Sequence, residues 1–166
     1  MNLWLRLLAL IWRLRRAPAL DPADPVELDM RVMPTDLDLL GHMNNGRYLS
    51  VMDLGRTALM MRLGIARIAR SRGWFPLVRH VSIEYFHPLR PLQRFRLSTQ
   101  VYSWDEKWFY IEQRFSVGER LCARAQVKGL LRSRGGNVAP TTVLTAVGAD
   151  ARQPPQDPPS GDVDAH

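Results

Sequence analysis

Residues Pro34 to Arg56 read PTDLDLLGHMNNGRYLSVMDLGR, a polar loop followed by the start of an apolar helix. Two aspartates, a histidine and two asparagines lie within ten residues of this loop, directly before the predicted helix. Short polar side chains at such a place have two common uses. They cap the helix by accepting hydrogen bonds from its free amides, or they form a reactive site at its N-terminus.

The helix is predicted to begin between Asn44 and Gly46 and to end by Gly73. Gly64 is expected to kink or divide it, and Gly73 is suited to cap its C-terminus. Residues at steps of three and four form one buried stripe. These residues are Tyr48, Met52, Gly55, Leu59, Leu63 and Ala66.

Five segments are predicted to be strands, one before the helix and four after it. Residues 26–33, VELDMRVM, alternate between apolar and polar side chains. The later four are rich in β-branched and aromatic residues and span 75–88, 94–104, 107–117 and 120–133. Their short connections indicate antiparallel neighbours. A short terminal helix is expected over residues 139–148.

A single long helix and five long strands predict an α+β fold in which the helix covers one face of a curled sheet. The other face, or an edge, then needs a cover, and self-association is the usual one. We expect this domain to span residues 26–148. A short amphipathic helix is expected within residues 1–17, and the Pro- and Asp-rich tail, residues 149–166, is expected to be disordered.

Composition limits the classes of function. The chain has 166 residues, of which 46 % are hydrophobic, enough for one folded domain. The single cysteine, Cys122, cannot form an internal disulfide, and without a secretory signal this favours a cytoplasmic location. The net charge of +7 favours anionic partners such as phosphates or acidic lipid. Because the charge is dispersed, no nucleic-acid partner is expected.

Residues 1–16, MNLWLRLLALIWRLRR, are apolar apart from four arginines. As a helix, residues 1–14 would be about 21 Å long, short of the hydrocarbon core of about 30 Å. Arg6 and Arg13 share one helix face, a pattern that suits a helix on an acidic membrane surface. This interpretation predicts peripheral contact with the inner face of the membrane. The alternative is a helix packed on the domain or on a dimer partner.

The order of these features resembles the hotdog fold of acyl-CoA thioesterases. The pattern Asp-x-Asp, three residues, His, then Asn-Asn before an aromatic is similar to the 4-hydroxybenzoyl-CoA-thioesterase-like branch. Residues 86–115, FHPLRPLQRFRLSTQVYSWDEKWFYIEQRF, also resemble a bacterial thioesterase-like group. The likeness extends from about residue 26 to 132. It implies a long central helix wrapped by a curled antiparallel five-stranded sheet, in a homodimer or tetramer.

The same resemblance implies three catalytic residues. Asp38 takes the place of the catalytic carboxylate, and the amide of Asn45 falls where the family places an oxyanion donor. His42 matches a histidine of the related plant acyl-carrier-protein thioesterases. In those enzymes an asparagine stands two residues before that histidine, where this chain has Leu40, which weakens the case for a full Asp-Asn-His set. Physically, free amides at a helix N-terminus are suited to hold a developing oxyanion.

Substrate contacts are expected from Asn44 and Tyr48 at the helix start, and from Arg90 toward the phosphates of coenzyme A. No metal and no separate cofactor are expected, since CoA enters as part of the substrate. The structural alternatives stay open. Asp36 and Asp38 are also typical of loop turns, with Asp36 expected to orient the loop, and Asn44 is a good N-cap.

The predicted function is therefore hydrolysis of an acyl-CoA thioester to the free acid and CoA. The main alternative is a non-catalytic acyl-CoA- or lipid-binding scaffold, associated with a membrane through its first helix. A hydratase or dehydratase of the same fold is a weaker alternative because its Asn and Pro signature residues are missing here. Asp53 is a further carboxylate, expected to pair with Arg56 one turn away.

Overall fold

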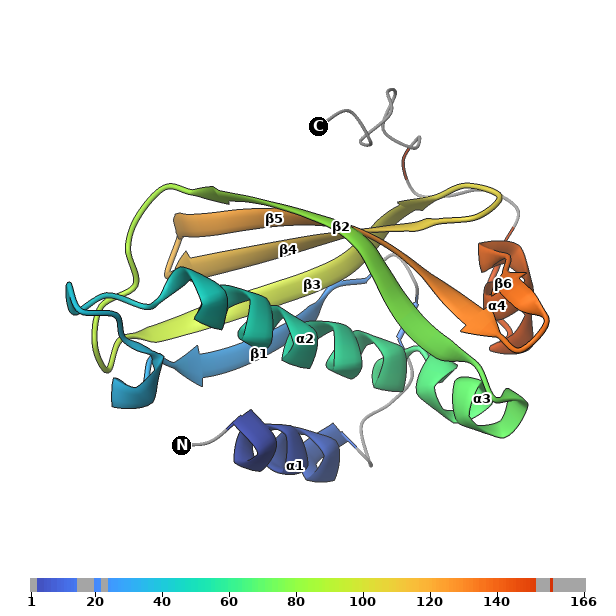
Figure 1. The fold of residues 1–166 in the computed structure, drawn as a ribbon, viewed down its shortest axis with the longest axis horizontal. Helices are drawn as coiled ribbons and strands as arrows, with labels where there is room; N and C mark the ends of the chain where they lie inside the picture. The colour runs from blue at the N-terminus through green and yellow to red at the C-terminus, as the bar shows by residue number, and fades with distance from the viewer. Residues whose placement is uncertain (1–2, 15–19, 22–23, 152–155, 157–166) are drawn as a thin grey trace.

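The structure is a computed structural model that describes residues 3–14, 20–21, 24–151 and 156 (Figure 1). The elements in chain order are α1 (Leu3–Leu14), β1 (Val26–Arg31), the 3-10 turn η1 (Pro34–Asp36), α2 (Asn45–Arg62), α3 (Ile65–Arg72), β2 (Phe75–Tyr85), β3 (Arg94–Trp104), β4 (Phe109–Val117), β5 (Arg120–Ser133), β6 (Gly136–Val138) and α4 (Pro140–Ala146). The order of strand, long helix and four long strands is the predicted one.

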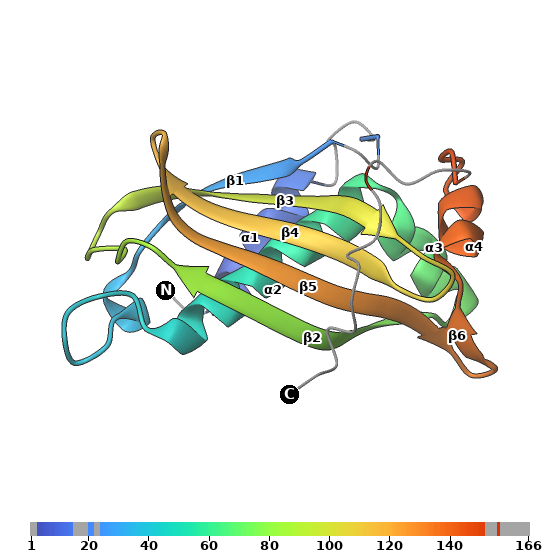
Figure 2. The ribbon, with the colours of Figure 1, turned by 90° about the horizontal axis from the view of Figure 1, so that it is seen from above.

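The strands form one antiparallel sheet in the order β1-β3-β4-β5-β2, with β6 paired to the end of β5 (Figure 2). The short β3–β4 and β4–β5 connections make neighbouring strands antiparallel, as expected. The chain enters on one edge with β1 and reaches the other edge with β2, because the long helix carries it across between them. The sheet therefore curls over α2, which lies along its concave face (Figure 1).

Helix α2 approaches the sheet closely at Gly55. A Cβ atom there would lie 2.4 Å from Thr99 Oγ1 and 2.8 Å from Leu97 Cδ2, both on β3. No side chain fits at that distance, so the helix can pack on the sheet only because position 55 carries a hydrogen atom. This glycine belongs to the stripe predicted from the sequence to be buried.

The buried side chains form two clusters. One contains the first half of α2, with Tyr48 and Met52 against Phe115 and the small residues of β5. The other contains the second half of α2 and gathers residues of α1, α3, α4 and the far end of the sheet. Gln113 lies fully buried on β4 and donates to the Met52 carbonyl at 3.0 Å and to Thr99 Oγ1 at 2.9 Å. This polar contact ties helix to sheet.

Helix α1 packs against α2 and β1 on the outside of the domain (Figure 1). Its inner face carries Arg6 and Leu10, which are 7 % and 9 % exposed. Of the two interpretations of this segment, packing on the domain therefore holds for one face of the helix. Arg6, whose shared face with Arg13 suggested a helix on an acidic membrane surface, is instead buried in an ion pair with Asp36. No helix in the described ranges is both long and apolar enough to span a membrane.

Most predicted elements are confirmed, including the break at Gly64, which separates α2 from α3, and the cap at Gly73. Two short elements were not predicted. The three-residue strand β6 pairs with β5, adding a sixth strand, and η1 occupies part of the expected irregular loop. Both are too short to carry a periodic pattern. Most of the predicted tail, and residues 1–2 and 15–17 of the predicted first helix, lie outside the described residues.

Candidate active site

The polar loop is a narrow excursion closed at its base by a bridge between Leu37 and Met43. The Asp38 amide donates to the His42 carbonyl at 2.8 Å, and the Gly41 amide donates to the Asp38 carbonyl at 3.2 Å. Gly41 adopts φ of 76°, the left-handed conformation that a glycine takes without strain. Leu39 and Leu40 in this turn are exposed to solvent. Asp38 and His42 lie opposite each other across the loop, joined by a backbone hydrogen bond.

The Asp38 carboxylate uses one oxygen for the loop and leaves the other open. Its Oδ1 accepts hydrogen bonds from the amides of Leu40 at 2.9 Å and His42 at 3.1 Å. Its Oδ2 has no hydrogen-bond partner among the described residues, and the side chain is half-buried. The structural interpretation of this residue therefore holds for Oδ1, and its catalytic role stays a prediction. The loop amides fix the orientation of the carboxylate, and the second oxygen is available to a ligand.

Helix α2 begins at Asn45, within the predicted range. Asn44 is the N-cap, and its Oδ1 accepts from the Gly46 amide at 2.8 Å. The amides of Met43, Asn44 and Arg47 are also occupied, by carbonyls of Leu89, Asp36 and Asn44. The Asn45 amide donates to no acceptor in the part of the chain that the structure describes. It is therefore an open donor at the positive end of an 18-residue helix dipole.

Asp36, at the other end of the loop, is 1 % exposed and saturated with hydrogen bonds. Its carboxylate accepts from Arg6 Nη2 at 2.6 Å, from Arg47 Nε at 3.1 Å and from the Met33 amide at 2.9 Å. Burial alone would raise the pKa of Asp36, but the Met33 amide and the two guanidinium groups outweigh it and hold the pKa below its usual value. Asp36 therefore joins three segments, α1, η1 and α2.

Two other predicted site residues, His42 and Tyr48, lie in different surroundings. His42 is half-buried beside Asp38 in the loop. Tyr48 is 2 % exposed and lies in the core, edge-on to the rings of Tyr85 and Phe115 at 5.1 and 4.9 Å. Its burial raises the pKa of its hydroxyl to about 12. The structure thus joins Asp38 and His42 within the loop, places Asn44 and Asn45 at the start of α2, and buries Tyr48 in the core.

Arg90 lies on the connection between β2 and β3, which packs against the polar loop. The neighbouring residue, Leu89, is fully buried, and its carbonyl accepts from the Met43 amide at 2.9 Å. The Arg90 amide donates to Gln93 Oε1 at 2.9 Å, while the residue itself is exposed. The fold therefore places this arginine one residue from a backbone contact with the polar loop, although it is far from that loop along the chain.

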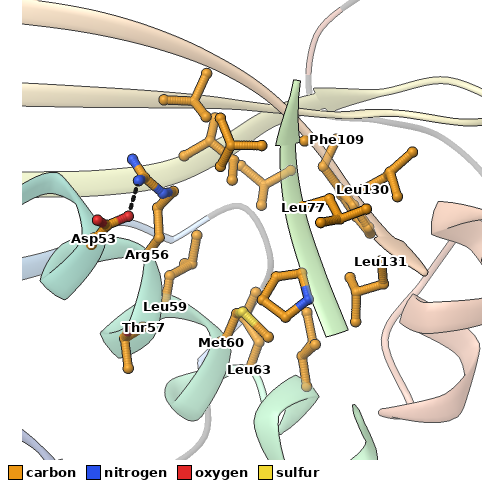
Figure 3. Close-up of a pocket in the computed structure, with 17 residues that line it drawn as sticks. Asp53, Arg56, Thr57, Leu59, Met60, Leu63, Leu77, Phe109, Leu130 and Leu131 are labelled. Atoms are coloured by element: carbon orange, nitrogen blue, oxygen red, sulfur yellow. Dashed lines mark hydrogen bonds and ion pairs between the residues drawn. The ribbon is translucent and has the colours of Figure 1, made fainter. Parts of the chain in front are cut away.

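A cavity of about 200 Å³ lies between the second half of α2 and strands β2, β4 and β5 (Figure 3). Its walls are mainly apolar, with Leu59, Met60, Leu63, Leu77 and Phe109 among them. At one end Arg56 donates to Gln113 Oε1 at 2.8 Å and pairs with Asp53, as predicted for that aspartate. The loop residues Asp38, His42 and Asn45 do not line it. Eleven residues of helix, about 16 Å, separate Asn45 from Arg56.

Three residues of this architecture escaped the sequence analysis. Arg6 and Arg47 bind Asp36, and Gln113 links Arg56 to the sheet. Each contact joins segments at least eleven residues apart, so local spacing gave no signal for it. The alternation of strand residues could have flagged Gln113, because it occupies an inward position between the apolar Ile111 and Phe115. Within the described residues, no three His, Cys, Asp or Glu side chains are grouped to hold a metal.

Comparison with known families gives a clear match. The model of the thioesterase-like superfamily matches residues 32–154. The chain is also 42 % identical over 84 residues to protein THEM6 of Xenopus laevis, a match that covers 51 % of this chain and 41 % of that protein. A probable thioesterase of Saccharomyces cerevisiae is 27 % identical over 124 residues, covering 73 % of this chain and 54 % of that one. The chain thus spans about half the length of these curated relatives.

Solved structures support the fold. A probable thioesterase from Bartonella henselae superposes with a TM-score of 0.63 at 23 % identity, covering 69 % of this chain and 98 % of that one. A 1,4-dihydroxy-2-naphthoyl-CoA thioesterase from Synechocystis superposes with a TM-score of 0.65 at 16 % identity, covering 78 % and 99 %. At such identities the likeness concerns the fold, and it confirms the predicted hotdog architecture.

Proposed function

Because the chain belongs to the thioesterase-like superfamily, we propose that it hydrolyses an acyl-CoA thioester to a free acid and CoA. The observation that carries the proposal is that two groups, one on the polar loop and one at the adjoining start of α2, each lack a hydrogen-bond partner in the described residues. Asp38 Oδ2 is an acceptor without a partner in the described residues, and the Asn45 amide is a donor without one. A thioester carbonyl needs both a base or nucleophile and a hydrogen-bond donor for its oxygen.

In this mechanism the thioester carbonyl oxygen accepts a hydrogen bond from the Asn45 amide. Asp38 Oδ2 takes a proton from a water molecule, whose oxygen attacks the carbonyl carbon. Negative charge then develops on the carbonyl oxygen, where the amide and the dipole of α2 stabilise it. The tetrahedral intermediate collapses by breaking the carbon–sulfur bond. The proton held by Asp38 passes to the leaving sulfur, which gives the acid and the CoA thiol.

The roles of the other site residues follow from their positions. Asn44 keeps its carboxamide oxygen on the helix cap and offers its NH₂ group to the substrate. Arg90 on the β2–β3 connection binds a phosphate of coenzyme A, and its flexible exposed side chain suits that task. Tyr48 supports the start of α2 from below, since it is buried among aromatic rings and its hydroxyl stays protonated at neutral pH. His42 holds the Asp38 turn through its backbone.

The apolar cavity beside α2 is suited to an acyl group, with the adaptable side chain of Met60 in its wall. In one chain it lies too far along α2 from Asn45 to serve the same thioester. Strand β2 is an edge strand with exposed apolar residues, among them Leu77 and Val78, and the exposed Phe86 follows directly after it. A two-fold dimer paired through β2 would set the two α2 helices antiparallel, so that Asn45 of one copy lies near the cavity of the other.

The test of this function is release of CoA thiol from a panel of acyl-CoA substrates of increasing chain length and of aryl-CoA compounds. We expect at least one substrate to be hydrolysed, with a rate that falls when β2 is blocked by Val78→Lys together with Phe86→Lys. Sedimentation of the same proteins should show that the double variant is monomeric. An absence of thiol release across the panel, by the wild-type chain in its oligomeric form, would contradict the proposal.

The second candidate function is a non-catalytic scaffold that binds acyl-CoA, for which we also propose a cytoplasmic location. It is favoured by the structural use of Asp38 Oδ1, which accepts from two loop amides, and by Leu40 in place of the asparagine of related enzymes. A scaffold would bind acyl-CoA in equilibrium dialysis without releasing thiol, and its affinity would not change with Asp38→Asn. Multiple turnovers by the wild-type chain would exclude it.

A further inference from the structure

The outer face of helix α1 is apolar and uncovered. Leu5, Leu8 and Trp12 are 55 %, 61 % and 77 % exposed. At about 100° per residue these three side chains fall within about 60° of one another on the helix, so they form one stripe. A contiguous exposed stripe of two leucines and a tryptophan more often indicates a binding surface than a random distribution of apolar residues.

The rotation of α1 about its axis is set by its inner face. Arg6 is buried and forms an ion pair with the buried carboxylate of Asp36, at 2.6 Å between Nη2 and Oδ2. Leu10, one turn further on, is 9 % exposed and belongs to the core cluster around α2. The helix cannot turn its outer stripe inward without breaking this ion pair inside the domain. The stripe therefore stays outside.

The segment that carries the stripe is basic. Residues 1–20 contain four arginines and no acidic residue. Asp36 pairs with Arg6, and the other three arginines of the segment, Arg13, Arg15 and Arg16, follow closely in the sequence. A stripe of leucine and tryptophan followed by arginines matches the boundary of an anionic bilayer, where apolar side chains enter the acyl region and cations meet headgroups.

We infer that α1 docks the protein on the surface of an anionic lipid bilayer, with Leu5, Leu8 and Trp12 inserted and the net positive charge of this arginine-rich segment attracted by the headgroups. Trp12 is suited to the interface, because its ring is apolar and its indole N–H remains near water. A second copy of α1 is a poorer occupant. In a parallel pair the basic ends of the two segments would lie together and repel, and in an antiparallel pair each basic end would meet the apolar start of the other segment.

This docking places the candidate active site close to the lipid. Arg6 projects from α1 directly onto Asp36, and Asp36 lies two residues from Asp38 on the same loop. Figure 1 shows α1 beneath α2, with the polar loop at the adjoining end of α2. The inference about the lipid surface rests on α1 alone and does not depend on the proposed hydrolase activity.

The test is co-sedimentation of the full chain with vesicles of phosphatidylcholine containing about 30 % phosphatidylglycerol, compared with vesicles of phosphatidylcholine alone. We expect binding to the anionic vesicles and at least tenfold weaker binding to the neutral ones. Leu8→Ser combined with Trp12→Ser should reduce binding to anionic vesicles by at least tenfold, because both side chains are exposed and their loss leaves the fold intact. Replacing Arg13, Arg15 and Arg16 with glutamine should reduce it on the order of a hundredfold.

The matched control is Leu92→Asn, which removes another leucine that is 57 % exposed, on the β2–β3 connection. Asparagine tolerates the φ of 60° at that position, so the fold is preserved. Its vesicle binding should equal that of the wild type. The inference is overturned if the wild type does not sediment with anionic vesicles, if neutral vesicles bind it equally, or if the α1 variants and the control bind alike. It is also overturned if the α1 substitutions lower the oligomer mass and leave vesicle binding unchanged.

Discussion

Asp36 and Asp38 stand two residues apart on one loop, and the structure gives them opposite surroundings. Asp36 is buried, and its two oxygens accept hydrogen bonds from two arginines and an amide. Asp38 is half-buried and uses a single oxygen, which binds two amides of its own turn. Neither residue has a cation within its own loop. The arginines that reach Asp36 come from α1 and α2, and none of the described ion pairs involves Asp38.

The difference separates a carboxylate whose two oxygens are both used within the fold from one that keeps an open oxygen. A carboxylate whose acceptor positions are filled and whose charge is paired stabilises the fold and has nothing left for a ligand. A carboxylate with one open oxygen, fixed by its other oxygen, is oriented and still available. Substitutions at Asp38 and at Asp36 change the two carboxylates separately.

The largest effect is expected for Asp38→Asn on thiol release. The amide group can still accept the two loop hydrogen bonds through its oxygen, but it cannot take a proton from water. We expect the turnover of the best acyl-CoA substrate to fall by about 10³-fold, with the free energy of unfolding changed by less than about 1 kcal/mol. Thiol-release kinetics and urea unfolding of the same sample measure the two quantities. Full activity in the variant would contradict the role of Asp38 as a base. Loss of the fold would contradict the expectation that asparagine preserves the two loop hydrogen bonds.

The next effect is expected for Asp36→Asn on stability. The substitution removes a buried charge that pairs with Arg6 and Arg47 and leaves the buried Arg6 guanidinium uncompensated. We expect the free energy of unfolding in urea to fall by about 3 kcal/mol. Asp29→Asn is the matched control, because the Asp29 side chain is 77 % exposed and pairs with Arg96 at the surface. That variant should unfold at the urea concentration of the wild type, and an equal loss in both would contradict the role given to burial.

Acid should reduce the difference between wild type and Asp36→Asn. The pKa of Asp36 is lower in the folded chain than in the unfolded one, so its contribution is fully present above about pH 4 and is lost as the pH falls through the folded value. The gap in unfolding free energy should be constant between about pH 5 and pH 7 and should narrow below about pH 4. Asp105 also has a lowered pKa, because hydrogen bonds from the amides of Lys107 and Trp108 outweigh its burial, but it is present in both proteins and cancels. If the difference in unfolding free energy widened in acid, the lowered pKa assigned to Asp36 would be wrong.

The smallest effect is expected for Asn44→Ala. The substitution removes the carboxamide oxygen that caps α2 and exposes the Gly46 amide beside Asn45. We expect a loss of about 1 kcal/mol in the free energy of unfolding, measured in urea, since N-cap substitutions typically cost that much. Asn44→Asp should restore stability, because aspartate caps as well as asparagine. If aspartate fails to do so, the oxygen of residue 44 is not acting as the cap.

Much of the fold followed from local pattern. The three- and four-residue spacing of α2 and the alternation of the strands were sufficient to predict both, because the burial of one face imposes a period on the chain. The start of α2 at Asn45 was predictable from Asn44, since capping is a contact between residues two apart. The hotdog arrangement then came from the order of the elements and from family resemblance.

The candidate site was predictable in its residues and only partly in its geometry. The loop residues were recognised from their spacing and from resemblance. Asp36 accepts hydrogen bonds through both carboxylate oxygens and Asp38 through only one, and this difference depends on tertiary contacts. The contact between the Leu89 carbonyl and the Met43 amide, which brings the segment of Arg90 to the loop, is also tertiary. Arg6 shows the limit most plainly. Its place in an apolar helix suggested a lipid contact, whereas the structure pairs it with a buried aspartate thirty residues away.

By itself, then, the sequence determined the elements, their order, the capped start of the central helix and the cluster of polar side chains before it, because all of these depend on residues within a few positions of one another. Only the tertiary structure decided which aspartate is buried, which way α1 faces and where an apolar cavity lies. Those properties arise when the folded chain brings distant segments together, since the charge of a carboxylate is tolerated in the interior only where cations from other elements reach it. The spacing of residues along the chain does not predict these long-range contacts.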